Sequence, residues 1–290
     1  MLAHQIIGVK AMNPSRKDYE RRIIEEIGNE GFAKLSRGYD LLGDIAIIDF
    51  KGSRDEEKKA AKVLMEFNSS IKTVLAKAGA ITGKYRIRKV RYVAGKRNFI
   101  AEYRENGCVF RFDVRKTYFS NRLSFERSRI LKLVKKGENV VIMFAGVGPF
   151  AVEIAKNIKE TKVIAIELNR DAYKYMLENI KLNKLGNMKA VCGDVHKIAK
   201  KYKGSADRVI MPLPNSSLEF LDDAYTVAGK NAVVHLYLFS KIEDGFDHVT
   251  SAIKEHSKRK KYKIKVLDKR VVRPYSATEQ EVVIDYSIRK

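Results

Sequence analysis

The sequence is poor in the features that mark secreted, metal-binding and membrane proteins. It has two cysteines in 290 residues, Cys108 and Cys192, which lie far apart and show no metal-ligand spacing. We therefore expect a reducing compartment and no structural zinc. No apolar run reaches about 18 residues, the length that a transmembrane helix needs. The N-terminus has no basic segment followed by a long apolar one, so no signal peptide is predicted. These absences favour a cytoplasmic protein with no membrane partner.

Acidic residues are scarce relative to basic ones. Lysine and arginine number 58 against 35 aspartates and glutamates, which gives a net charge of +23. Adaptation to heat raises the number of charges of both signs, but it does not explain so large an imbalance. An excess of this size indicates a polyanionic partner.

The basic excess is concentrated in residues 81–130, which hold 14 basic and 4 acidic residues. Aromatic residues are mixed with them, although most of their rings are expected in the core. Cations interleaved with rings favour RNA over a membrane surface, because exposed bases stack on aromatic side chains. The aromatic residues are Tyr85, Tyr92, Phe99, Tyr103, Phe110, Phe112, Tyr118, Phe119 and Phe125.

Residues 1–117 have the pattern of a small basic α/β domain that binds RNA. Apolar residues recur at helical spacing in two segments, the first of which ends at Gly28. The Asn106-Gly107 turn between two alternating segments predicts a hairpin. The expected helices cover 15–28 and 55–78, and the expected strands cover 45–50, 85–93, 98–107 and 108–114.

Residues 118–290 alternate strand and helix patterns, and the chain closes with two strands that have no long helix between them. Repeated βα units followed by a terminal β pair predict an α/β fold with a Rossmann-like, mostly parallel, doubly wound sheet and an antiparallel C-terminal edge. The expected strands cover 139–145, 161–168, 188–193, 207–214, 231–239, 262–272 and 279–289, and the expected helices cover 124–136, 149–158, 170–184, 217–229 and 245–259.

A nucleotide-type site is predicted where the strands of this sheet end. Gly146 and Gly148, in the segment FAGVGPF between a strand and a helix, permit a tight turn and a close approach of the backbone to a ligand. Glu167 ends the next strand, 21 residues after Gly146, where an acid hydrogen-bonds ribose hydroxyls. Asp194 follows the third strand and is placed to accept from an adenine amine. The three pieces together favour a nucleoside-containing cofactor.

Two other nucleotide-binding classes fit less well. A dinucleotide dehydrogenase requires a third glycine in its loop, and Ala151 occupies that position. Its second mononucleotide half is also not supplied by the terminal strand pair. A P-loop is excluded because Gly83-Lys84 is followed by Tyr85, where serine or threonine is required.

The motifs YFSNRLSFER, Tyr118 to Arg127, and FAGVGPF, together with DRVIMPLP, closely resemble the archaeal and eukaryotic tRNA (guanine-37-N1)-methyltransferases. The resemblance runs from about Leu35 to the C-terminus. It implies a class I methyltransferase fold, S-adenosyl-L-methionine as cofactor, and transfer of a methyl group to N1 of guanosine 37 in the anticodon stem-loop of tRNA. It also implies a monomer. About 34 residues precede the matching region, too few for the extra N-terminal domain that such enzymes often carry.

The resemblance assigns roles to individual residues. Glu126 matches the general base, Arg86 matches an arginine that contacts the target guanine, and Arg122 lies near that guanine. From the residues alone, Glu126 would instead be read as a surface ion pair with Arg129, three residues later. The implied cofactor-binding residues are Tyr118, Arg127, Phe144, Gly146, Gly148, Glu167, Asp194, Pro212 and Pro214.

Two departures from the family pattern leave other functions open. Ile142 stands where the glycine-loop strand usually ends in aspartate, and Pro212 stands where many members have asparagine. They favour a catalytically impaired RNA-binding relative. A wybutosine-pathway aminocarboxypropyl transferase, or a methyltransferase that also acts on a wyosine intermediate, is a second alternative. Val147 and Pro149 in the glycine loop argue against the aminocarboxypropyl transferase.

Overall fold

The computed structural model describes residues 16–36, 38–83 and 85–290, which divide into two compact units. The first unit extends to Gly79 and includes Lys89–Asn98, and the second comprises Ala80–Arg88 and Phe99–Lys290. Among the described residues, no helix combines the length and the apolar character needed to cross a membrane.

The first unit contains two helices and a four-stranded sheet in the order β1-β2-β3-β4. Strands β1 and β2 are antiparallel, whereas β2 and β3 are parallel. Helix α2 begins with a capping box, in which Ser53 and Glu56 each bond the other's backbone N–H. The elements are α1 (Arg16–Ala33), β1 (Asp40–Leu42), β2 (Ile45–Ile48), α2 (Arg54–Phe67), β3 (Thr73–Thr82) and β4 (Ile87–Gly95).

Two expectations for this unit need correction. The helix predicted over 55–78 ends at Phe67, and residues from Thr73 onward form β3. Asn68 stops the helix, because its side chain accepts bonds from the N–H and hydroxyl groups of Ser70. Apolar residues beyond that turn fit a strand as well as a helix. Gly28 interrupts α1 with a φ of 71° as expected, but helical structure resumes and reaches Ala33.

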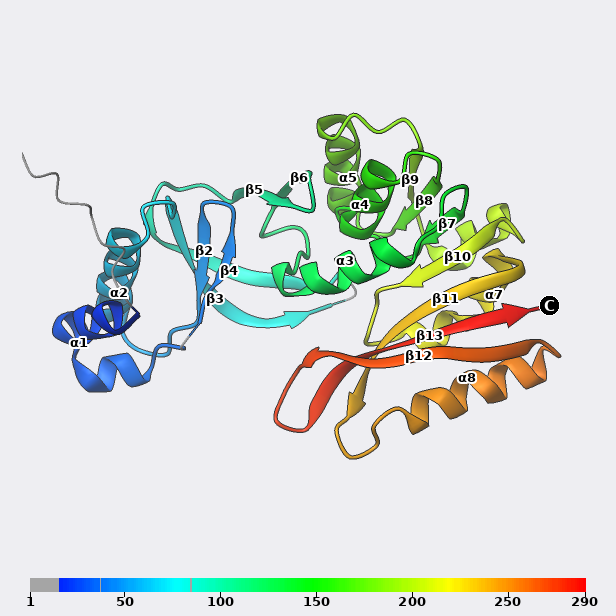
Figure 1. Ribbon diagram of the computed structural model, residues 1–290. Coiled ribbons are helices and arrows are strands. Elements are labelled where there is room, and N and C mark those ends of the chain that lie inside the picture. The colour runs from blue at the N-terminus through cyan, green and yellow to red at the C-terminus, as the bar shows by residue number, and fades with distance from the viewer. Residues whose placement is uncertain (1–15, 37, 84) are drawn as a thin grey trace, which may run out of the picture. The chain divides into compact units, whose positions relative to one another are not determined.

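The second unit contains the predicted doubly wound sheet. Its seven strands run in the order β12-β13-β11-β10-β7-β8-β9 (Figure 1). Neighbours from β11 to β9 are parallel, and β13 is antiparallel to both β11 and β12, so the antiparallel C-terminal edge is confirmed. The strands are β7 (Asn139–Ile142), β8 (Lys162–Glu167), β9 (Met188–Cys192), β10 (Ala206–Met211), β11 (Ala228–Lys241), β12 (Lys263–Pro274) and β13 (Glu279–Arg289).

Helices pack against this sheet through alternate residues of its strands. Val141 and Met143 join one buried cluster with apolar residues of α6, α7 and α8, whereas their neighbour Ile142 is buried outside that cluster. The helices are α3 (Ser124–Leu133), α4 (Pro149–Asn157), α5 (Arg170–Leu182), α6 (Val195–Ile198), α7 (Leu221–Val227) and α8 (Asp247–Arg259), with short helices η1 (Asn121–Leu123), η2 (Ala199–Tyr202) and η3 (Ser217–Phe220).

The hairpin of β5 (Ile100–Glu105) and β6 (Cys108–Asp113) is confirmed, with positive φ at Asn106 and Gly107. The sequence analysis placed this hairpin in the small domain, with a boundary after residue 117. The compact units divide at residue 98 instead. The reason is α5, where Asn179 and Asn183 bond the backbone of β6 at 2.7–2.9 Å. These contacts hold the hairpin against α5 in the second unit.

Candidate active site

A cleft of about 270 Å³ lies in the second unit where the parallel strands end. Its volume is close to the lower limit for small-molecule sites, roughly 300 Å³. Phe144 and Pro212 follow β7 and β10, and Glu167 ends β8, so the cleft occupies the edge at which such sheets bind ligands. The predicted residues that line it are Arg86, Tyr118, Phe144, Gly146, Glu167, Pro212 and Pro214.

The glycine loop and Glu167 are joined directly. The Glu167 carboxylate accepts from the backbone N–H of Gly146 at 2.7 Å through Oε2 and from that of Asn169 at 2.6 Å through Oε1. Burial raises the pKa of Glu167 above its usual value, and the backbone donors oppose that rise. A carboxylate offers about four acceptor positions, so capacity remains for hydroxyl groups of a ligand.

The two glycines of the loop have different surroundings. Gly148 caps α4 with a φ of 89°, and a Cβ there would meet Met176 Cγ at 3.0 Å. Gly148 is therefore required for packing and does not line the cleft. Gly146 has a φ of 60°, and the nearest atom to a Cβ there would be Tyr118 O at 3.7 Å. A side chain at Gly146 would project into open space, as expected where a ligand approaches the backbone.

An aromatic pair forms one wall of the cleft. The rings of Phe144 and Phe220 meet edge to face with centroids 4.7 Å apart, and His196 stacks on the other side of Phe220. Asp194, predicted to contact adenine, does not line the cleft. Its carboxylate caps α6 by accepting from the N–H of His196 at 2.9 Å. The contact of Asp194 with adenine therefore stays a prediction, and its role as a helix cap was not predicted from the sequence.

Arg86 lines the cleft with a guanidinium group that has unused hydrogen-bond donors. Its guanidinium lies 5.3 Å from the Tyr118 ring centroid and 5.7 Å from that of Phe239. Its Nε and Nη1 atoms are buried and have no hydrogen-bond partner in the described part of the chain. Buried donors left unpaired are costly, so this arrangement suits a ligand that supplies acceptors.

Arg127 does not reach the cleft. Its guanidinium is 1% exposed and binds Glu105 on β5, the backbone oxygen of Ser120 at 3.0 Å, and Glu153 on α4 at 3.2 Å. Burial, together with the hydrogen bond and negative charge of neighbouring Glu105, raises the pKa of Glu153 to about 9. The structure thus places Arg127 in a buried ion cluster that joins the hairpin to α3 and α4, away from the predicted cofactor contact.

Glu126 also lies outside the cleft lining, at the start of α3, and it is 2% exposed. Arg129 donates to its two oxygens at 2.7 and 2.9 Å, and the Tyr237 hydroxyl donates to Oε1 at 2.6 Å. The ion pair with Arg129 expected from spacing exists, but it is buried. These three bonds leave one acceptor position of Oε2 among the described residues.

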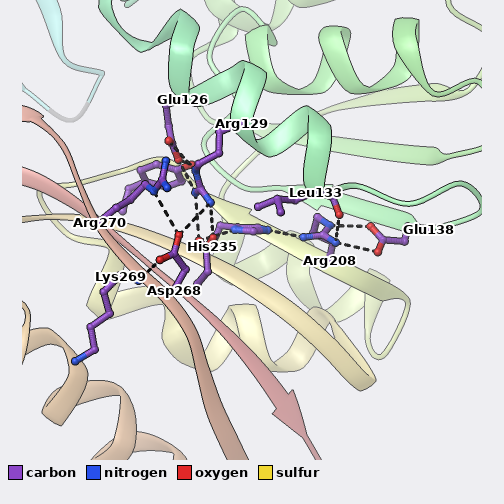
Figure 2. A network of polar contacts seen from close by, with 11 residues as sticks. Glu126, Arg129, Leu133, Glu138, Arg208, His235, Asp268, Lys269 and Arg270 are labelled. Carbon is purple, nitrogen blue, oxygen red and sulfur yellow. Dashed lines mark hydrogen bonds and ion pairs between the residues drawn. The ribbon is translucent and has the colours of Figure 1, made fainter.

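The Glu126–Arg129 pair begins a chain of polar contacts (Figure 2). Arg129 also binds Asp285 at 2.6 Å, and Asp285 accepts from His235 Nδ1 at 2.7 Å. His235 Nε2 then accepts from Arg208 at 2.7 Å. Burial lowers the pKa of His235, and the His235 and Arg129 contacts lower that of Asp285 to about 2 against the opposing effect of burial. Glu126 is therefore held by a rigid buried network.

The remaining predicted residues are placed as follows. Arg122 lies in η1 and does not line the cleft, although its neighbour Leu123 does. Ile142, the first departure, is buried in β7. Several residues of the cleft lining were not predicted from the sequence, among them Asn215, Phe220 and Glu281. Nothing in the sequence sets Glu281 apart, because β13 also contains Glu279, Asp285 and Arg289. No cluster of potential metal ligands occurs among the described residues.

Comparison with known families gives a clear result. The family model for the TRM5/TYW2 methyltransferase domain matches residues 101–267, and that for the TYW2 N-terminal domain matches residues 19–98. The chain belongs to the TRM5/TYW2 methyltransferase family. The two models meet where the compact units divide, near residue 98.

Relatives in this family include both kinds of transferase. The chain is 35% identical to the tRNA (guanine(37)-N(1))-methyltransferase Trm5b of Pyrococcus abyssi over 98% of this chain and 84% of that protein. It is 32% identical to the tRNA(Phe) (4-demethylwyosine(37)-C(7)) aminocarboxypropyltransferase of Methanocaldococcus jannaschii over 85% of this chain and 96% of that one. A solved complex of aTrm5 and tRNALeu aligns with a TM-score of 0.83 at 29% identity, over 99% of this chain and 83% of that one.

Proposed function

We propose that this protein is a tRNA methyltransferase that transfers the methyl group of S-adenosyl-L-methionine to N1 of guanosine 37. The observation that carries the proposal is the cleft, in which a glycine loop and Glu167 lie beside Arg86 with its unpaired donors. S-adenosyl-L-methionine supplies the electrophilic methyl group when it is bound. Glu167 would hold its ribose hydroxyls, and Phe144 with Phe220 would pack against its adenine.

The chain's own residues fit the chemistry that N1 requires. Guanine N1 carries a proton at neutral pH and becomes a good nucleophile when that proton is removed. We assign removal of the proton to Glu126 from its match to the family motif; the carboxylate is buried outside the cleft lining and keeps one open acceptor position, on Oε2. Arg86 donates to O6, where negative charge develops as the proton leaves. Arg129 and Tyr237 then act as positioning residues for Glu126.

A second candidate function is aminocarboxypropyl transfer to a wyosine base from the same cofactor. The match to the TYW2 N-terminal domain and the similarity to the Methanocaldococcus aminocarboxypropyltransferase favour it. The higher identity to Trm5b and the presence of Val147 and Pro149 in the glycine loop favour methyl transfer.

The basic residues of 81–130 are proposed to contact tRNA. Lys89, Lys96 and Arg97 are exposed, and the Tyr92 ring is 37% exposed. Exposed cations beside an exposed ring suit a folded RNA with unstacked bases. We propose that the protein acts as a monomer in the cytoplasm on the anticodon stem-loop.

The deciding experiment uses unmodified tRNA with two labelled forms of the cofactor, one labelled in the methyl group and one in the carboxyl group. We expect the methyl label alone to enter the anticodon loop, and mass analysis to identify 1-methylguanosine at position 37. Transfer of the carboxyl label to tRNA that contains 4-demethylwyosine would establish the second function instead. Cofactor binding without transfer to either RNA would identify an impaired relative.

A further inference from the structure

Glu281 is a buried carboxylate in the cleft to which no motif assigns a role. It lies on β13, is 2% exposed, and its Oε2 accepts from Arg273 Nε at 2.7 Å. A carboxylate is expensive to bury unless it is paired. Arg273 satisfies one oxygen, and the residue still contributes to the lining of the cleft. Its position suits contact with a bound molecule.

Strand register brings Glu281 close to Arg86. Glu281 pairs with Phe239 across the antiparallel strands β13 and β11. Side chains paired in this way lie about 5 Å apart at Cβ. The Arg86 guanidinium lies 5.7 Å from the centroid of the same Phe239 ring, yet its Nε and Nη1 have no hydrogen-bond partner among the described residues. A cation with unused donors and a carboxylate therefore flank one aromatic ring and line one cleft.

We propose that Glu281 and Arg86 together read the Watson–Crick edge of the target guanine. This inference rests on the proposed function. Guanine presents an acceptor at O6 and donors at N1 and the 2-amino group. Arg86 donates to O6, Glu281 accepts from the 2-amino group, and N1 lies between them. Adenine presents a donor at position 6, which faces the Arg86 donors unfavourably, and only a C–H group at position 2, which leaves Glu281 without a donor.

Pro212 gives this role a physical reason. It lines the cleft, and proline offers neither a side-chain amide nor an N–H. The cleft therefore needs polar recognition from another residue. Glu281 supplies an acceptor in the same cleft, and Arg273 fixes its orientation. Glu281 is thus a specificity-determining residue.

The test compares tRNA transcripts that carry guanosine or inosine at position 37, because inosine lacks the 2-amino group. For the wild type we expect kcat/KM to favour guanosine about 10- to 100-fold, the scale of a hydrogen bond to a charged acceptor. In Glu281→Gln the ratio should fall to about 1. In this variant Arg273 should still donate to the oxygen of the new side-chain amide. The amide nitrogen, itself a donor, then faces the 2-amino group of guanine.

Two further variants make the result specific. Glu279→Gln, two residues earlier on β13 and outside the cleft lining, should keep the wild-type ratio. The double change Glu281→Ala with Arg273→Ala removes both charges together and should also bring the ratio to about 1. Equal wild-type rates on the two transcripts, or an unchanged ratio in the Glu281 variants, would overturn the inference and leave the methyltransferase intact. A wild type that methylates neither transcript would instead refute the proposed function.

Discussion

At the scale of single residues, partners decide what a charged side chain does. Arg86 and Arg127 were both assigned to the site from one resemblance. Arg127 has three partners in a buried cluster, whereas Arg86 retains unpaired donors in the cleft. Buried polar groups without partners are rare in folded proteins, so the unpaired arginine is the one that indicates a ligand.

The proposed role of Glu126 as the base can be tested by a single substitution. Glu126→Gln keeps the size of the side chain and one acceptor for Arg129, but it removes the base. We expect single-turnover methyl transfer to fall by about 10²- to 10⁴-fold, the usual contribution of a general base. Cofactor affinity should remain, because Glu126 does not line the cleft. Tyr237→Phe removes one bond to Glu126 and should cost much less. Wild-type speed in Glu126→Gln would leave Glu126 with a structural role alone.

At the scale of elements, buried polar contacts hold the hairpin and helices around the cleft. The β5–β6 hairpin is fixed by asparagines of α5 and by the Glu105–Arg127–Glu153 cluster. In that cluster two carboxyl groups compete for one guanidinium. Hydrogen bonds from Arg127 and Glu153 lower the pKa of Glu105 despite its burial, and the pKa of Glu153 is raised. The proton on Glu153 is therefore part of the contact between elements.

This proton makes stability depend on pH. The folded pKa of Glu153, about 9, lies above its ordinary value of 4.5. The folded state alone holds the proton between these values, so its contribution to stability is full below about pH 4.5 and is lost as the pH rises through about 9. Glu153→Gln mimics the protonated form. We expect its unfolding free energy, relative to wild type, to rise by at least about 1 kcal/mol between pH 5 and pH 8.

Urea unfolding across this pH range measures the effect. Glu102→Gln, at an exposed position on the same hairpin, is the matched control and should follow the wild-type curve. Parallel curves for Glu153→Gln and wild type would show that Glu153 is not protonated in the folded state.

At the scale of the whole molecule, the net charge of +23 predicts a strong salt dependence of tRNA binding. We expect log affinity to fall linearly with log salt concentration. Replacing Lys89, Lys96 and Arg97 by alanine should weaken binding and make the slope shallower, by about 0.7–0.9 for each lost phosphate contact.

The control variant removes the same charge elsewhere. Lys258, Arg259 and Lys261 are exposed at the end of α8 and beyond it, outside residues 81–130. Their replacement by alanine should leave the slope nearly unchanged. Filter binding or fluorescence titration with unmodified tRNA at several salt concentrations measures both variants. Equal slopes in the two variants would mean that tRNA binding depends on the total charge of the protein and not on the basic residues of 81–130.

The sequence by itself determined the doubly wound sheet, its antiparallel edge, the β5–β6 hairpin and the glycine loop with Glu167. These depend on local periodicity, turn residues and the spacing between neighbouring strands, which are all written along the chain. Tertiary structure decided most of the rest. Tertiary contacts of Asn179 and Asn183 moved the unit boundary to residue 98, whereas the helix that ends at Phe67 is stopped by a local bond from Ser70 to Asn68. Tertiary structure also bonded Arg127 to Glu105 and Glu153, which lie more than 20 residues away in sequence, and it placed Glu281 in the cleft lining with residues from distant parts of the chain.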